Sequence, residues 1–185
     1  MSNDFEALER HQNYLQMLAR LQLDSRLRKQ FDSSDVVQET LRKAHENQHQ
    51  YNGQSEEELK QWLRRILTNQ LIDWVRKYVQ DKPFERSLEE SLEQSSARLD
   101  IVLAANQSSP SEQVLWHELI DRLAEALAKL SEDQRQAVEM KHLRGCKIAD
   151  IAQQMGRSVN AVASLLRRGL AHLREHLQGE QGGLP

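Results

Sequence analysis

The sequence of 185 residues has little of what several protein classes require. Its one cysteine, Cys146, leaves no partner for a disulfide within the chain. No apolar run approaches the roughly 18–20 residues that a membrane span needs. The first residues do not join a basic stretch to an apolar one, so we expect no secretory signal. With the single cysteine and no apolar span, we expect a cytoplasmic protein without membrane association. Three prolines, with 38% apolar and 29% charged residues, argue against a fibrous or disordered chain.

Motifs that mark common enzyme classes are also missing. We find no glycine-rich phosphate loop and no nucleophile elbow. Three pairs of potential metal ligands stand four residues apart: His45 with His49, His142 with Cys146, and His172 with His176. Seven histidines in a helical chain often form such pairs by chance. We therefore predict no enzymatic activity, no catalytic residue, no cofactor and no metal site, and we interpret Cys146 as a half-buried structural thiol rather than a redox group.

The net charge of −3 gives no sign of an anionic partner, but the charges are unevenly distributed. Residues 60–78 carry five basic side chains against Asp73 alone, and residues 157–174 carry four arginines and no acid. Residues 81–129 hold ten acidic and five basic side chains. Local charge decides whether a surface meets phosphate. Each basic stretch is therefore either a phosphate-binding surface or a solvated helix face.

Apolar residues recur at three- and four-residue steps almost throughout, which predicts an all-α fold. We expect a first helix over 3–22 and a second after the cap signal Asp32-Ser33-Ser34. The sequence Ser55-Glu56-Glu57-Glu58 is a capping box, and its helix should run to about Tyr78. Residues 1–80 would form the first helical domain.

The second half predicts another small helical domain over residues 109–178. Residues 81–108 have the character of an acidic, flexible linker, and 179–185 that of a tail. Ser109-Pro110-Ser111-Glu112 starts a helix that should reach Lys129. Ser131-Glu132-Asp133-Gln134 is a further capping box, whose helix should end at Arg144-Gly145.

The most informative stretch follows. A short helix from Ile148 to Met155, a turn at Gly156 and a longer helix capped by Ser158 have the order of a helix-turn-helix. The second helix should bury an apolar side from Val159 to Leu177, which includes Leu170. Its polar and basic residues suit base edges and phosphates. An ordinary helical hairpin is the alternative on this pattern alone.

These motifs resemble a known family. Those of the C-terminal half are Leu130-Ser-Glu-Asp-Gln-Arg135, Ile148-Ala-Asp-Ile-Ala152, Met155-Gly-Arg-Ser158, Ala161-Val162, Leu170 and Leu173-Arg174. They are similar to region 4 of the sigma-70 family of RNA polymerase sigma factors. Those of the N-terminal half are Asp35-Val-Val-Gln-Glu39, Thr40, Leu41, Trp62-Leu-Arg-Arg-Ile-Leu-Thr-Asn69 and Leu71-Ile-Asp-Trp-Val-Arg76. They resemble region 2, and the two sets together are similar to the extracytoplasmic-function (ECF) group.

The resemblance implies an alternative sigma factor that binds core RNA polymerase and directs promoter recognition, DNA melting and transcription initiation. It also implies the partners: the clamp coiled coil of the largest polymerase subunit, the flap of the second-largest subunit, and promoter DNA. An anti-sigma factor is common in the ECF group, although nothing in the sequence identifies one. The alternative is a helix-turn-helix regulator that acts without core polymerase.

The resemblance carries over residue by residue. The positions that match the polymerase-binding surface are Asp35, Gln38 and Glu39. Those that match the helix facing the −10 element and its opened strand are Arg64, Arg65, Asn69, Asp73 and Arg76. The loop His49–Ser55 matches the one that captures a flipped base. Those that match the helix reading the −35 element are Arg157, Ser158, Asn160, Ala161, Ser164, Arg167 and Arg168.

Some features admit a second interpretation. We expect Trp62 and Trp74 to be core residues rather than platforms for bases. Asp73 lies one turn before Arg76 and Lys77, so an ion pair on the helix surface is an alternative to a DNA role. Family recognition helices often carry basic residues where Ala163 and Leu165 stand. Gly169 replaces a usual alanine and should cost about 1 kcal/mol of helix stability.

Overall fold

The computed structural model describes residues 8–23, 32–78, 86, 90 and 110–179. Every segment of regular structure in these ranges is helical and none is a strand, which confirms the predicted all-α fold. The chain divides into two compact units, Met1–Leu119 and Ile120–Pro185. Most of the predicted linker and tail lies outside the described residues. None of the described helices combines the length and the hydrophobicity that crossing a bilayer demands.

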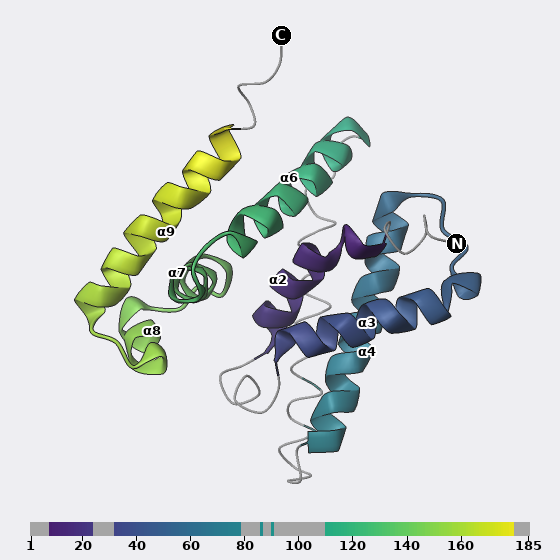
Figure 1. The fold of residues 1–185 in the computed structure, drawn as a ribbon, viewed down its shortest axis with the longest axis horizontal. Coiled ribbons are helices and arrows are strands. Elements are labelled where there is room, and N and C mark those ends of the chain that lie inside the picture. Colours follow the sequence, from purple (N-terminus) through teal and green to yellow (C-terminus); the bar gives the residue numbers. More distant parts are fainter. Residues whose placement is uncertain (1–7, 24–31, 79–85, 87–89, 91–109, 180–185) are drawn as a thin grey trace. The chain divides into compact units, whose positions relative to one another are not determined.

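Residues 8–23 and 32–78 of the N-terminal unit form a helical bundle. The bundle contains α2 (Gln12–Gln22), α3 (Ser33–Glu46) and α4 (Glu56–Tyr78), with a short 3-10 turn, η2 (Gln48–Gln50), between the last two. Helix α3 packs against both α2 and α4 (Figure 1). Fully buried leucines of α2 and α4 lie at the centre of this bundle: Leu15, Leu18, Leu63, Leu67 and Leu71. Each stabilises the unit by roughly 1.5–3 kcal/mol.

Local hydrogen bonds confirm the predicted starts of α3 and α4. The Asp32 carboxylate accepts the Ser34 amide at 2.9 Å. The Ser55 hydroxyl accepts the Glu58 amide at 3.2 Å, and the Glu58 carboxylate accepts the Ser55 amide at 3.2 Å. These side chains satisfy amides that a helix leaves without a partner in its first turn. Helix α4 therefore begins and ends where the sequence predicts.

The first helix differs from the prediction. Residues 8–9 are helical, Arg10 and His11 form a turn, and α2 starts only at Gln12. The reason is tertiary, because His11 is buried and its Nε2 lies 3.7 Å from Oε1 of Glu56 in α4. Residues 3–7 of the predicted helix lie outside the described part of the chain.

Helix α6 (Pro110–Ala128) starts in the first unit and ends in the second. The C-terminal unit continues with α7 (Glu132–Val138), the π-helical turn η3 (Glu139–Leu143), α8 (Ile148–Met155) and α9 (Val159–Gly179). Both α7 and α8 pack against α9. Gly156 has a φ of 62° between α8 and α9, as the predicted turn requires.

The capping box expected at Ser131 does not form. Helix α7 begins at the predicted place, but no side-chain hydrogen bond caps it. Gln134, the residue that would complete the box, is buried, and Glu132 pairs with Arg135. The helix also widens into the π-turn before it ends, and there the Arg144 amide bonds the Glu139 carbonyl at 3.0 Å. Propensity identified this helix, while its detailed geometry depends on packing.

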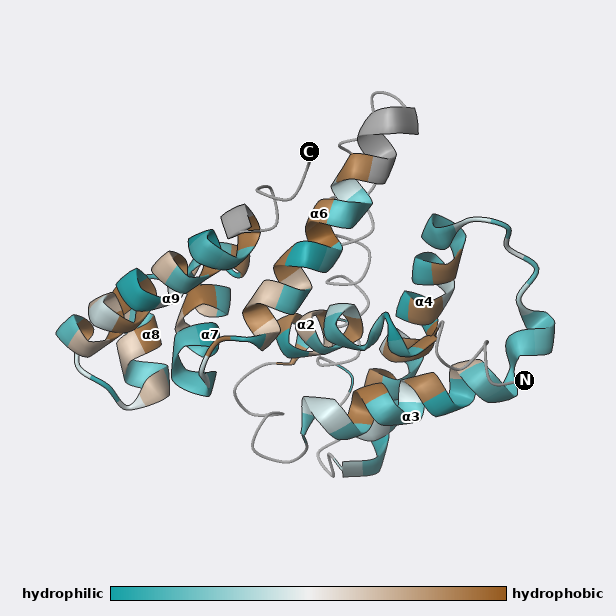
Figure 2. Cartoon of the chain, turned by 45° about the horizontal axis from the view of Figure 1, so that its top comes forward, coloured by the Kyte–Doolittle hydropathy of each residue, from teal (hydrophilic) through white to brown (hydrophobic). Residues whose placement is uncertain are grey.

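The buried side of α9 is narrower than predicted. Val162, Leu166 and Leu173 are buried, but Val159 is 52% exposed and Leu170 is 37% exposed. Figure 2 shows hydrophobic and hydrophilic residues alternating along α9, as expected for an amphipathic helix. Val159 opens the helix directly after the cap residue, where no neighbouring turn covers it.

Gly169 lies where α9 approaches α7. A Cβ at this position would come within 2.9 Å of Val138 Cγ2 and 3.5 Å of Gln134 Cβ. Alanine would gain about 1 kcal/mol of helix propensity. Because valine is stiff and overpacking typically costs about 1–3 kcal/mol, the loss should exceed the gain. We therefore expect Gly169→Ala to lower the melting temperature in circular dichroism.

The matched control is Ala171, an exposed position on the same helix. Ala171→Gly should destabilise by about 1 kcal/mol through propensity alone. A higher melting temperature for Gly169→Ala would show that α7 yields to the added methyl group.

Candidate protein- and nucleic-acid-binding surfaces

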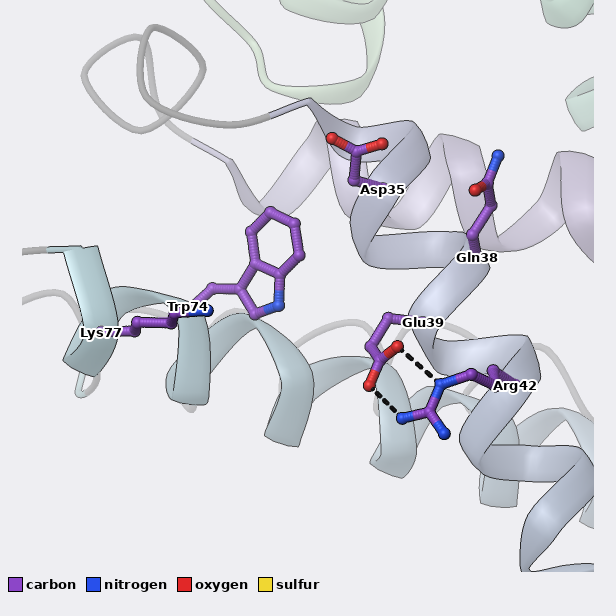
Figure 3. A pocket seen from close by; sticks show the side chains of 6 residues that line it. All are labelled: Asp35, Gln38, Glu39, Arg42, Trp74 and Lys77. Atoms are coloured by element: carbon purple, nitrogen blue, oxygen red, sulfur yellow. Dashed lines mark hydrogen bonds and ion pairs between the residues drawn. The ribbon is translucent and has the colours of Figure 1, made fainter.

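Two surface hollows lie between α3 and α4. The first, which we name the carboxylate hollow, has a volume of about 460 Å³. Its lining residues are Asp35, Gln38, Glu39, Arg42, Trp74 and Lys77. Figure 3 shows the first four on α3 and the last two on α4, with the Trp74 ring between the helices. All three residues predicted to bind polymerase thus line one hollow.

A bidentate ion pair holds the Glu39 carboxylate of this hollow in its charged form. Arg42 donates to Glu39 through Nε at 2.8 Å and through Nη2 at 2.6 Å (Figure 3). It also pairs with Glu46. These bonds lower the pKa of Glu39 and raise that of Arg42. Glu39 is therefore ionised and held in place at neutral pH. Asp35, one turn earlier, is exposed.

The second hollow, which we name the amide hollow, has a volume of about 530 Å³. Its lining residues are Lys43, Asn47, Gln50, Trp62, Arg65, Ile66, Asn69, Gln70 and Asp73. It brings together three of the five residues predicted to face the −10 element. Lys43 Nζ lies 3.7 Å from Oδ2 of Asp73, so Asp73 pairs across to α3, a partner that sequence spacing did not suggest.

Two positions on α4 behave differently from the rest of the predicted set. Arg64 is only 7% exposed, and its Nη1 donates to the Tyr14 hydroxyl at 2.9 Å. The structure therefore does not bring Arg64 to the amide hollow, because its guanidinium satisfies a buried phenol on α2. Arg76 is exposed, but it lies outside the residues that line either hollow.

The two tryptophans are not core residues, contrary to the prediction. Trp62 and Trp74 are each half-buried, and each lines one hollow. The Trp62 ring lies 5.2 Å from that of Tyr51, and the Trp74 ring 5.6 Å from that of Tyr78. An aromatic face at a hollow provides a surface for a cation or an unpaired base. Sequence reasoning missed Lys43 on α3 and Asn47, the residue that follows this helix; both line the amide hollow.

The second helix of the helix-turn-helix presents a polar face. Asn160, Arg167 and Arg168 are exposed, while Ala161 and Ser164 are half-buried. The Ser158 hydroxyl accepts the Ala161 amide at 3.2 Å, which confirms its cap role. Arg157 Nη2 lies 2.7 Å from Oδ2 of Asp133 in α7, so this arginine is already paired.

None of the described residues form a group of three or more His, Cys, Asp or Glu side chains that could hold a metal ion. The predicted functional residues are instead distributed over helix surfaces and shallow hollows. Such surfaces can bind a partner helix or nucleic acid.

Comparisons with known proteins identify the family of this chain. The family profile "Sigma-70 region 2" matches residues 8–80, and "Sigma-70, region 4" matches residues 120–173. The ECF sigma factor SigX of Bacillus subtilis is 25% identical over 79% of this chain and 71% of its own. The ECF sigma factor SigL of Mycobacterium tuberculosis is 31% identical over 79% of this chain and 75% of its own.

Among solved structures, the sigma factor RpoE in complex with the anti-sigma factor NepR from Bartonella quintana is similar at 24% identity. That match covers 96% of this chain and 98% of the other, with a TM-score of 0.35, which does not establish a shared overall arrangement. The relatives and the two regions together do not fit a regulator that acts without polymerase. The chain belongs to the sigma-70 family of RNA polymerase sigma factors, in its ECF group, and is an alternative sigma factor.

Proposed function

We propose that this sigma factor divides its work among three surfaces. The carboxylate hollow binds the clamp coiled coil of core polymerase, the amide hollow receives the opened −10 strand, and α9 reads the −35 element. The observation that carries the proposal is the separation of the first two surfaces. Asp35, Gln38 and Glu39 line one hollow, whereas Arg65, Asn69 and Asp73 line another.

The chemistry of each hollow suits its proposed partner. In the carboxylate hollow, an ionised Glu39 and an exposed Asp35 stand beside a half-buried indole. Carboxylates with an aromatic face attract guanidinium and ammonium groups of a protein partner. The amide hollow combines two cations with four side-chain amides. Amides hydrogen-bond base edges, and cations neutralise phosphates.

Helix α9 has the composition of a major-groove reader. Asn160 stands in its first turn, and Arg167 and Arg168 follow two turns later, all exposed. No acidic side chain lies between residues 157 and 174 to repel phosphate. Core polymerase carries out the chemistry, and the sigma factor itself is no enzyme. Because the proposed function is at bacterial promoters, we expect the chain to act in the cytoplasm.

Binding to core polymerase tests the proposal first, because it requires no knowledge of the promoter. The purified chain is titrated onto immobilised bacterial core enzyme, and the resulting holoenzyme then transcribes a promoter library randomised at −35 and −10. We expect one-to-one binding and enrichment of sequence at both elements. Binding without enrichment at −10, or no binding by the folded chain, would refute the assignment.

Substitution of Asn160 or Arg167 by alanine should change upstream recognition only. Each lost base contact should reduce discrimination at one −35 position by about 1–3 kcal/mol. A lost phosphate contact should instead weaken binding to all promoter sequences equally. It should also reduce the slope of log affinity against log salt concentration by about one. Affinity for core polymerase should stay unchanged. Arg174→Ala is the matched control, because this exposed arginine of α9 lies outside the residues predicted to read the −35 element.

A further inference from the structure

The loop that precedes α4 is folded around one aromatic ring. Tyr51 ends the turn η2, and its ring centroid lies 5.2 Å from that of Trp62 at an interplanar angle of 34°. Its hydroxyl donates to the Ser55 carbonyl at 3.1 Å. A Cβ on Gly53 would come within 2.5 Å of Cε2 and Cζ of the same ring. The loop backbone therefore lies against the ring at a distance that only glycine permits.

The far end of the loop is fixed as well. The Glu58 carboxylate accepts the Gln54 amide at 2.7 Å and the Ser55 amide at 3.2 Å. These hydrogen bonds lower the pKa of Glu58. Burial raises the pKa of Tyr51, which remains a neutral donor at physiological pH. The segment from Tyr51 to Ser55 is thus anchored by the ring at one end and by the capping box at the other.

Tyr51 does not line the amide hollow, yet it contacts or adjoins residues that do. Trp62, on which its ring packs, is one lining residue. Gln50, its neighbour in sequence, is another, and Gln50 Nε2 donates to Asn47 Oδ1 at 3.1 Å. Asn47 Nδ2 in turn donates to the Lys43 carbonyl at 2.8 Å. Tyr51 is therefore connected, through Trp62 and through its neighbour Gln50, to residues that line the hollow.

We propose that Tyr51 is a positioning residue that holds Trp62 and Gln50 in the geometry with which the amide hollow discriminates between unpaired promoter bases. The inference rests on the proposed function of that hollow. Discrimination by hydrogen bonds requires donors and acceptors that are already in place, because a loose site adapts to the wrong base. Tyr51 supplies this order through its ring, which packs on Trp62.

The test uses the holoenzyme formed from core polymerase and the full chain. A promoter library randomised across the −10 region is transcribed, and the transcripts are sequenced. For Tyr51→Ala we expect the preference for the favoured base at one or two −10 positions to fall about tenfold or more. Preferences at −35 should stay as in the wild type.

Two variants separate positioning from folding. Tyr51→Phe keeps the ring on Trp62 and loses only the hydroxyl bond, so it should retain most of the preference. Gly53→Ala keeps the tyrosine but forces its ring away, so it should reproduce the alanine variant. Tyr78→Ala removes an aromatic side chain elsewhere on α4 and should leave base preference intact. The melting temperature of each variant is measured alongside.

The outcomes distinguish the inference from the function on which it rests. Gln50→Ala and Asn69→Ala test the hollow itself, and if neither changes −10 preference, the proposed function of the hollow fails. If both change it and Tyr51→Ala does not, the hollow reads DNA and the positioning role is wrong. The inference would also be overturned if Tyr51→Ala reduced transcript yield from all −10 sequences equally, in proportion to the fall in its melting temperature.

Discussion

Replacement of Glu39 by lysine is expected to lower the affinity for core RNA polymerase by about a hundredfold, whereas the same change at Glu46 should leave it within about twofold. Glu39 lines the carboxylate hollow, and Glu46 does not. Reversal of a charge at a protein interface costs roughly 2–5 kcal/mol, and every 1.4 kcal/mol is tenfold in affinity. Affinity is measured by titration onto immobilised core enzyme at fixed salt.

Glu46 is a close control because both glutamates lie on α3 and both pair with Arg42. Each substitution removes an ion pair with the exposed Arg42, worth about 1 kcal/mol or less, so stability should change little in either variant. Equal losses of affinity would show that the orientation of Arg42, and not the Glu39 carboxylate, governs binding. No loss in either variant would place the docking surface elsewhere.

The sequence predicted the helices where local chemistry decides them. Asp32 caps α3, Ser55 and Glu58 close the start of α4, and Gly156 turns the chain between α8 and α9. These signals act within four residues, so they depend little on the rest of the fold. Ser131 has the same pattern as Ser55 and makes no cap bond, and Gln134, at the position that corresponds to Glu58, is buried.

Long-range contacts explain what the sequence could not predict. The break before α2 follows from the burial of His11 near Glu56, which lies 45 residues further along the chain. The partner of Asp73 is Lys43 on another helix, although Arg76 and Lys77 stand within one turn. The role of Gly169 is likewise set by Val138. Periodicity describes one helix at a time and carries no information about the neighbour.

The candidate sites show the same division. Family motifs identified Arg65, Asn69 and Asp73, which the structure brings together in one hollow. They did not identify Trp62, because an aromatic residue on an apolar stripe is usually core. Only the structure shows it half-buried beneath Tyr51. Exposure at a hollow, rather than residue type, separates a surface tryptophan from a core one.

Alanine in place of Arg65 should impair promoter opening without destabilising the protein. Alanine in place of Arg64 should destabilise the protein without a direct effect on promoter opening. Arg65 is exposed and lines the amide hollow. Its loss should change stability by less than about 0.5 kcal/mol. Open-complex formation should fall about tenfold, as a lost charge-assisted contact predicts. Arg64 is buried against Tyr14, and its loss should destabilise the N-terminal unit by about 2–4 kcal/mol.

Promoter opening is measured by the permanganate reactivity of promoter thymines, with holoenzyme at saturating sigma factor. Stability is measured by urea denaturation of the free chain. Saturation matters, because it compensates for the folded fraction that Arg64→Ala loses. Tyr14→Phe removes the hydroxyl that Arg64 bonds, so combined with Arg64→Ala it should add less than its separate effect. If Arg64→Ala is stable and defective in opening, its guanidinium leaves Tyr14 to reach DNA in the open complex, and the adjacent arginines act as one surface.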